Sequence, residues 1–199
     1  MNTGLYECHG HALMDGAAYA DARRRHAPGV DTGAVRKFLE ALRGAGVTYF
    51  RDGGDALGVS LYARSIAGEY GITYRSPAFA IHKKGRYGGI VGRAWTDLRE
   101  YRALVSEAKD AGCDFIKLMY SGIITFREYG ELSCPGLDAD EIAEPVDFRQ
   151  HPFHRGQIVQ VRRHRRRADA AGADFLQRLL RMLQVPAVQD QVAALLRHE

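Results

Sequence analysis

The chain has 199 residues, of which 46% are hydrophobic and 26% charged, and its formal net charge is +4. This length is enough for one well-buried domain. No apolar run approaches the ~18 residues of a membrane span, and no signal-peptide pattern opens the sequence, so a cytoplasmic protein without a membrane partner is expected. Three scattered cysteines favour reduced thiols over a disulfide framework or a zinc finger: Cys8, Cys113 and Cys134.

Basic charge and glycine are divided unevenly along the chain. Residues 145–199 contain ten Arg, no Lys, five acidic residues and only two of the 22 Gly. We therefore divide the chain into a domain at 1–144 and an atypical Arg-rich tail at 145–199, which is expected to be helical or disordered. A reading-frame change near Pro145 in a GC-rich gene would produce such a tail, and translating the DNA in the other two frames would test this hypothesis.

Hydrophobic spacing predicts alternating strands and helices in residues 1–144. The expected strands are 5–9, 47–52, 72–81 with an interruption at Pro77, and 115–119. The expected helices are 31–43, 57–70 and 97–111, the last with Thr96 as its N-cap, and another helix is expected to begin at Asp138. Residues 83–89 are expected to form a loop. Alternating elements of this size imply parallel strands joined by right-handed crossovers, in a barrel or an open sheet.

A His-x-His pair lies at the end of the first expected strand. Alternate side chains of a strand share a face, so His9 and His11 project the same way. Neutral imidazole is a common ligand for Zn, Fe, Mn and Ni. The pair therefore indicates a metal site, although two ordinary polar histidines at a strand end would give the same pattern.

Lys117 lies in the middle of an otherwise apolar strand. A buried lysine requires a partner, neutralisation or covalent modification, whereas a lysine at a sheet edge can extend into solvent. Both alternatives fit this position taken alone. Reaction of the amine with carbon dioxide would give a carbamate, which is an anionic oxygen ligand able to bridge two cations.

Three ordered segments resemble the amidohydrolase superfamily, and most closely its imidazolonepropionase-like and prolidase-like branch. They are residues 7–16 with the His-x-His pair, residues 46–54 and residues 112–119. The resemblance covers about residues 4–144. It implies a partial TIM (β/α)8 barrel of about four strands and one or two divalent metal ions, expected to be zinc. His9 and His11 match the family's strand 1 ligands, and Lys117 matches the carbamylated lysine of strand 4.

The resemblance implies hydrolysis of a C–N bond in a small amide, dipeptide-like or cyclic amide substrate by a metal-activated water. Four further residues in or beyond the C-terminal parts of strands are expected to bind that substrate: Asp52, His82, Tyr120 and Ser121.

The family's strand 5 and strand 6 histidines and its strand 8 aspartate are not found, so no general base is assigned. His151 and His154 are disfavoured as replacements because Pro152 separates them and no strand flanks them. The chain is therefore expected to be a truncated form with low or no activity, or a noncatalytic remnant. Its open sheet edges would favour self-association. Nucleic-acid binding by the arginine run 162–167 is disfavoured, since no aromatic platform accompanies it.

Overall fold

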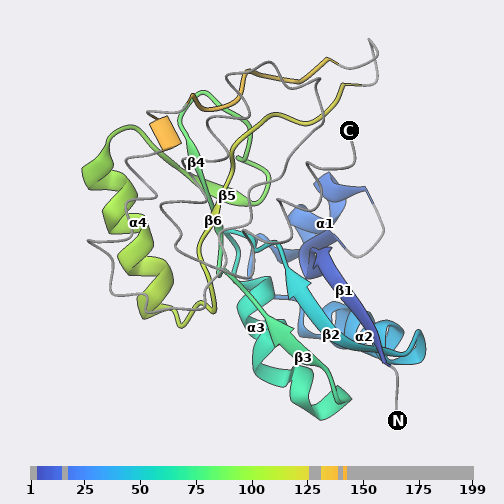
Figure 1. Ribbon diagram of the computed structural model, residues 1–199. Helices are drawn as coiled ribbons and strands as arrows, with labels where there is room; N and C mark the ends of the chain where they lie inside the picture. Colours follow the sequence, from blue (N-terminus) through green and yellow to red (C-terminus); the bar gives the residue numbers. More distant parts are fainter. Residues whose placement is uncertain (1–3, 15–17, 126–130, 139–140, 143–199) are drawn as a thin grey trace, which may run out of the picture. The chain divides into compact units, whose positions relative to one another are not determined.

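The computed structural model describes residues 4–14, 18–125, 131–138 and 141–142 of the chain. They form a mixed α/β fold with two parallel sheets of three strands each (Figure 1). All of them belong to the first of two structural units, Met1–Arg162. The predicted boundary near Pro145, the Arg-rich tail and the two histidines at 151 and 154 lie outside the described residues. The mixed α/β class and the parallel pairing predicted from the sequence are confirmed, whereas the strict alternation of strands and helices is not, because β3, β4 and β5 follow one another without a helix between them.

The first sheet has the order β1-β2-β3, with all its strands parallel. Its strands are β1 (Leu5–Gly10), β2 (Val47–Asp52) and β3 (Thr73–Arg75). The helical elements of this half are η1 (Ala12–Met14), α1 (Tyr19–His26), α2 (Thr32–Gly44), α3 (Val59–Ile66) and η2 (Ala67–Tyr70). Helix α2 begins where predicted, because the Asp31 side chain accepts a hydrogen bond from the Ala34 backbone N–H at 3.0 Å.

The second sheet has the order β5-β4-β6, again with parallel strands. Its strands are β4 (Ala80–Lys83), β5 (Gly92–Trp95) and β6 (Lys117–Leu118). Helix α4 (Leu98–Asp110) joins β5 to β6 (Figure 1). The expected strand at 115–119 is thus only two residues long. Strand β5 was not predicted, because its four residues follow a glycine-rich segment and show no clear alternation.

The expected strand at 72–81 is divided into β3 and β4, which belong to different sheets. Pro77 has no N–H to give to a ladder, and Ala78 adopts a left-handed conformation with φ of 63°. The Phe79 N–H donates to the Pro77 carbonyl at 2.9 Å, which closes a γ-turn around Ala78. This turn moves the chain from the first sheet to the second.

The predicted N-cap of helix α4, Thr96, is wrong by one residue. Asp97 is the cap, and its side chain accepts a hydrogen bond from the Glu100 N–H at 2.8 Å. The Glu100 carboxylate in turn accepts from the N–H of Thr96, the residue before the cap, at 2.7 Å, so the two acids each satisfy a backbone donor at the start of the helix. Helix α1 was also missed, because its arginine run hides any apolar periodicity.

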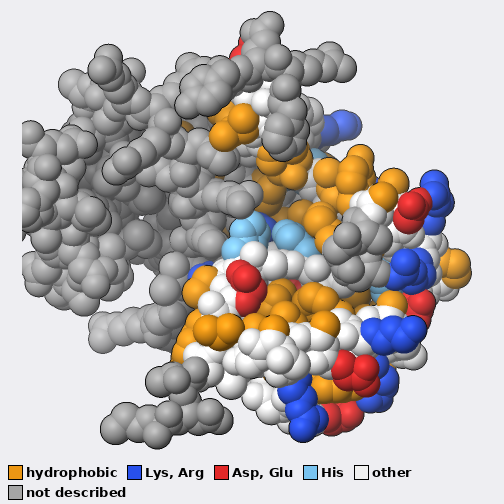
Figure 2. Space-filling model, turned by 90° about the vertical axis from the view of Figure 1, so that its right-hand side faces the viewer, with side chains coloured by type: hydrophobic (Ala, Val, Ile, Leu, Met, Phe, Trp, Pro, Cys, Tyr) orange, Lys and Arg blue, Asp and Glu red, His pale blue; other side chains and the backbone are white. Residues whose placement is uncertain are grey.

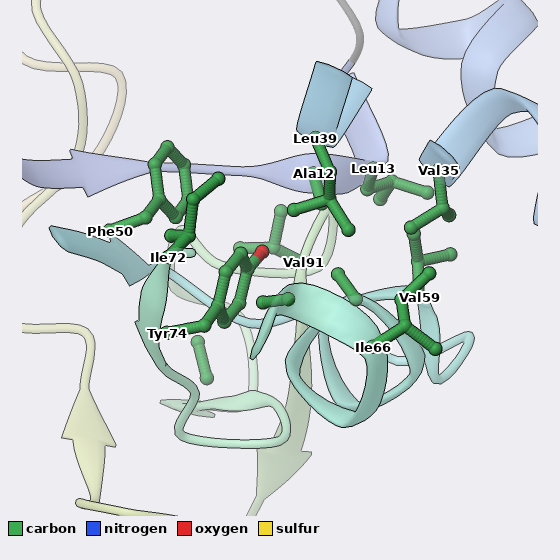
Figure 3. Close-up of a cluster of buried hydrophobic side chains, with 13 residues drawn as sticks. Ala12, Leu13, Val35, Leu39, Phe50, Val59, Ile66, Ile72, Tyr74 and Val91 are labelled. Atoms are coloured by element: carbon green, nitrogen blue, oxygen red, sulfur yellow. The ribbon is translucent and has the colours of Figure 1, made fainter. Parts of the chain in front are cut away.

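The main core lies between the first sheet and the helices α2 and α3 (Figure 3). Val35 and Leu39 of α2 and Val59 of α3 are at most 1% exposed. They share this cluster with Phe50 of β2, whose ring stacks on Tyr74 of β3 with centroids 5.1 Å apart. The core therefore packs α2 and α3 against β2 and β3, and Ala12 and Leu13, which follow β1 directly, belong to the same cluster.

None of the three cysteines, all of which lie in the described residues, forms a disulfide. Within the part of the chain that the structure describes, none of the helices combines the length and apolar character needed to cross a membrane.

Candidate metal centre

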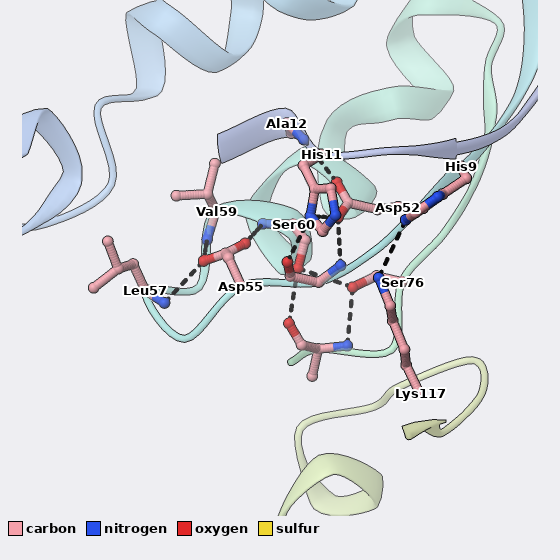
Figure 4. A network of polar contacts seen from close by, with 12 residues as sticks. His9, His11, Ala12, Asp52, Asp55, Leu57, Val59, Ser60, Ser76 and Lys117 are labelled. Carbon is pink, nitrogen blue, oxygen red and sulfur yellow. Dashed lines mark hydrogen bonds and ion pairs between the residues drawn. The ribbon is translucent and has the colours of Figure 1, made fainter. Parts of the chain in front are cut away.

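The structure brings His9, His11 and Lys117 together although the lysine is 108 residues from His9. Strands β1 and β6 belong to different sheets, yet Nζ of Lys117 lies 3.2 Å from Nε2 of His9 (Figure 4). An ammonium group can only donate, so Nε2 of His9 accepts this hydrogen bond. Lys117 is only 7% exposed. The alternative in which it extends into solvent is therefore excluded.

The two histidines project to one side of the chain, as their spacing predicts. Their ring centroids are 5.4 Å apart, with the planes at 61°. Gly10 between them faces the opposite way, where a Cβ atom would lie 2.5 Å from Cζ of Phe50. Figure 2 shows histidine side chains at the surface of one face, beside hydrophobic ones. Among the described histidines, His9 and His11 are partly exposed, so the pair is accessible from solvent.

His11 is oriented by the backbone of the loop that follows β2. Its Nδ1 lies 3.0 Å from the Gly54 carbonyl oxygen. Because a carbonyl oxygen only accepts, the proton of the neutral ring lies on Nδ1 and the lone pair on Nε2. This is the arrangement that a histidine ligand needs for binding a metal through Nε2.

Gly53 lies against both His11 and Lys117. A Cβ atom at this position would be 2.6 Å from Nζ of Lys117 and closer still to the His11 ring. Such a contact would force one of the two side chains to move. The absence of a side chain at Gly53 therefore keeps open the space in which the His11 ring and the lysine amine meet.

Asp52 was expected to bind substrate, but its carboxylate is buried and engaged in the protein interior. It is 1% exposed and accepts hydrogen bonds from the Ala12 N–H at 3.0 Å, the Gly54 N–H at 2.6 Å and the Tyr74 hydroxyl. Burial raises the pKa of Asp52 from 3.8 to about 6, because the carboxylate loses its hydration, while the three donors act in the opposite direction. Its oxygen Oδ1 lies 4.0 Å from Nδ1 of His11.

The raised pKa of Asp52 predicts a pH dependence of stability in the metal-free protein. Between about pH 4 and pH 6 the folded state binds more protons at Asp52 than the unfolded state does. The contribution of Asp52 to the free energy of unfolding is therefore most favourable below this window and decreases as the pH rises through it. The difference is roughly 3 kcal/mol, since one pKa unit corresponds to about 1.4 kcal/mol. Urea unfolding of the wild type and of Asp52→Asn across pH 4–7 measures it. Parallel profiles would contradict the prediction.

The other expected substrate-binding residues make local contacts. His82 is 7% exposed, with Nδ1 3.0 Å from the Lys83 carbonyl oxygen. The Tyr120 carbonyl accepts from the Leu137 N–H at 2.8 Å, and Ser121 is partly exposed. These contacts do not place the three residues beside the histidine pair, and their substrate role stays a prediction.

A divalent metal fits these residues in part. His9 and His11 would supply two imidazole nitrogens, which zinc binds readily, and their ring centroids lie 5.4 Å apart. A lysine ammonium has no lone pair to offer, so Lys117 becomes a ligand only after conversion to an anion. Among the residues that the structure describes, no group of three or more His, Cys, Asp or Glu side chains could hold a metal ion.

Three residues near the candidate centre were not predicted as part of it: Gly53, Gly54 and Tyr74. The Gly-Gly pair directly after β2 was the available signal, but such a pair is usually only a turn. Tyr74 carried no signal, because an aromatic residue in a strand is ordinarily part of the core.

The comparisons with known proteins concern the fold. A crystal structure of a protein described as uncharacterized has a TM-score of 0.51 to this chain and 23% sequence identity, covering 72% of this chain and 39% of that one. The chain thus spans less than two fifths of that protein, and at this identity the similarity shows the fold alone. No family model matches the chain, and no curated protein matches it.

Proposed function

We propose that this chain carries part of an amidohydrolase-type metal centre, which hydrolyses a C–N bond in a small amide, dipeptide-like or cyclic amide substrate. In this proposal, zinc is the metal, and the described βα units form one half of a (β/α)8 barrel in the cytoplasm. The observation that carries it is the 3.2 Å approach of Lys117 to His9 across two sheets.

The burial of Lys117 supports a chemical role for this amine. A lysine that is 7% exposed has lost most of its hydration, and burying a cation is costly. Its amine lies 3.2 Å from the imidazole nitrogen Nε2 of His9, which can act as a proton acceptor. Conversion to a carbamate would remove this buried cation, which is the chemical role proposed for the amine.

In the proposed site the lysine reacts to become the third ligand. The Nζ lone pair forms a bond to the carbon of carbon dioxide, one C–O π bond opens, and the nitrogen loses a proton. Nε2 of His9 at 3.2 Å can take this proton and pass it to solvent. The product is an anionic carbamate beside the two histidines. A divalent ion at such a site supplies activation of water for attack on an amide carbonyl.

Metal binding and hydrolysis test this proposal in the full chain. We expect about one zinc ion or more per chain after incubation in zinc and bicarbonate, and at least a 100-fold loss of zinc affinity in His9→Ala and Lys117→Met. Carbon-13 NMR with labelled bicarbonate should show a carbamate signal that Lys117→Met lacks. Lys37→Met, which changes an exposed lysine of α2, is the matched control and should retain both properties.

Turnover of N-acyl amino acids, dipeptides and cyclic amides by the zinc-loaded chain would support the enzymatic function. Absence of zinc binding would contradict the whole proposal. A noncatalytic metal site is the second candidate, favoured because the described residues lack a cluster of three conventional ligands. The noncatalytic site would be supported if the chain binds zinc, loses this binding in His9→Ala and hydrolyses none of these amides.

A further inference from the structure

The buried carboxylate of Asp52 binds two backbone groups that contact or adjoin His11, one in Ala12 and one in Gly54. Its oxygen Oδ2 accepts a hydrogen bond from the N–H of Ala12, the residue directly after His11. Its other oxygen, Oδ1, accepts from the N–H of Gly54, whose own carbonyl receives the His11 Nδ1 proton. One carboxylate therefore holds both the main chain and the ring of His11 (Figure 4).

The Gly54 peptide is fixed from two further directions. Its φ of +79° is left-handed, and a Cβ atom there would lie 2.8 Å from Cγ of Pro77 and 3.0 Å from Cα of Phe79. Gly54 is thus packed against the turn between β3 and β4. The peptide that carries its carbonyl is held by the Asp55 N–H, which donates to the Ala78 carbonyl of that turn at 3.0 Å, and the carbonyl oxygen lies 3.0 Å from Nδ1 of His11.

Tyr74 fixes the carboxylate itself. Its hydroxyl donates to Asp52 Oδ2, and its ring is stacked on Phe50 within the main core. The side chain is 6% exposed. A rigid core residue therefore determines where the Asp52 carboxylate lies, and this position is transmitted to Gly54.

We infer that Asp52 and Tyr74 are positioning residues for His11, keeping its proton on Nδ1 and presenting Nε2 as the ligand nitrogen toward Lys117. Two features on the Nδ1 side favour this tautomer: the Gly54 carbonyl at 3.0 Å and the Asp52 carboxylate at 4.0 Å. On the opposite side, Gly53 leaves the ring facing the lysine amine. The assignment of Nε2 as a metal ligand rests on the proposed function. The assignment of the proton to Nδ1 is independent of it.

The tautomer can be read in the metal-free full chain by nitrogen-15 NMR of the histidine rings. We expect His11 to be protonated on Nδ1 in the wild type and to lose this preference in Asp52→Asn and in the milder variant Tyr74→Phe. His26 is an internal control, because its Nδ1 accepts from the Asp31 N–H at 3.0 Å and so carries no proton. Its unchanged signal shows that a variant is folded.

Protonation of His11 on Nε2 in the wild type would overturn the inference, and so would an unchanged His11 tautomer in a folded Tyr74→Phe variant. Because the chain is metal-free, neither result depends on the proposed function. In the zinc-loaded chain both variants should bind zinc 10- to 100-fold more weakly, as for other groups that orient a ligand. Failure of the wild type to bind zinc would count against the proposed function alone.

Discussion

Asp52→Ala is expected to lower the free energy of unfolding of the metal-free protein by about 3 kcal/mol at pH 5, measured by urea unfolding. The substitution removes the acceptor of three buried donors at once, from Ala12, Gly54 and Tyr74. A buried donor left without an acceptor costs about 1–3 kcal/mol, and these three costs are not additive because the groups share one site.

The loss should be smaller at pH 7 than at pH 5. Above its raised pKa of about 6 the wild-type carboxylate is charged in a buried place, so the wild type is itself less stable there, and the alanine variant escapes this effect. Asp110→Ala is the matched control, because Asp110 is exposed at the end of α4 and should change stability by less than about 0.5 kcal/mol. Equal losses in the two variants would contradict the role of Asp52.

Asp114→Ala is expected to lower the free energy of unfolding by about 2–3 kcal/mol. The Asp114 side chain, 7% exposed, lies 2.8 Å from Nε of Arg64 on α3 and 2.9 Å from Nη1 of Arg75 on β3. It also accepts a hydrogen bond from the Ser76 N–H at 2.9 Å, just before the turn that divides the two sheets. Its removal therefore loosens the connection of α3 and β3 to the segment that precedes β6.

Most of this loss should come from the backbone donor of Ser76 rather than from the arginines, which are 36% and 52% exposed and therefore screened by solvent. Arg75→Ala should accordingly lose less than about 1 kcal/mol. Asp114→Asn keeps an oxygen that can accept from the Ser76 N–H, so its loss of stability should lie between those of Arg75→Ala and Asp114→Ala. Thermal unfolding of the three variants measures this order. A larger loss in Arg75→Ala than in Asp114→Ala would show that the ion pair dominates.

Local sequence patterns were sufficient to predict β1, β2, α2 and α4 and to choose the metal-binding candidates, but they missed α1, β5 and the division of residues 72–81 into two strands. Asp31 marks the start of α2 because its carboxylate caps the first helical turn. His9 and His11 share a face because a strand alternates with a period of two. These properties depend on neighbours a few residues apart, so the order of residues alone decides them.

Tertiary structure decided what the polar residues do. Asp52 ends a strand like a substrate-binding residue, but its hydrogen bonds to Ala12 and Tyr74 reach residues 40 and 22 positions away and bury it. The turn at Ala78 places β3 and β4 in different sheets. The approach of Lys117 to His9 depends on both sheets, because 108 residues separate the two side chains.

By itself, therefore, the sequence determined a mixed α/β chain with parallel strands and with His9, His11 and Lys117 as candidate ligands. Only the folded chain decided that the three meet and that Asp52 supports His11 from within. The physical reason is that strand periodicity and helix capping act between neighbours, whereas burial and pairing across sheets depend on how distant segments pack.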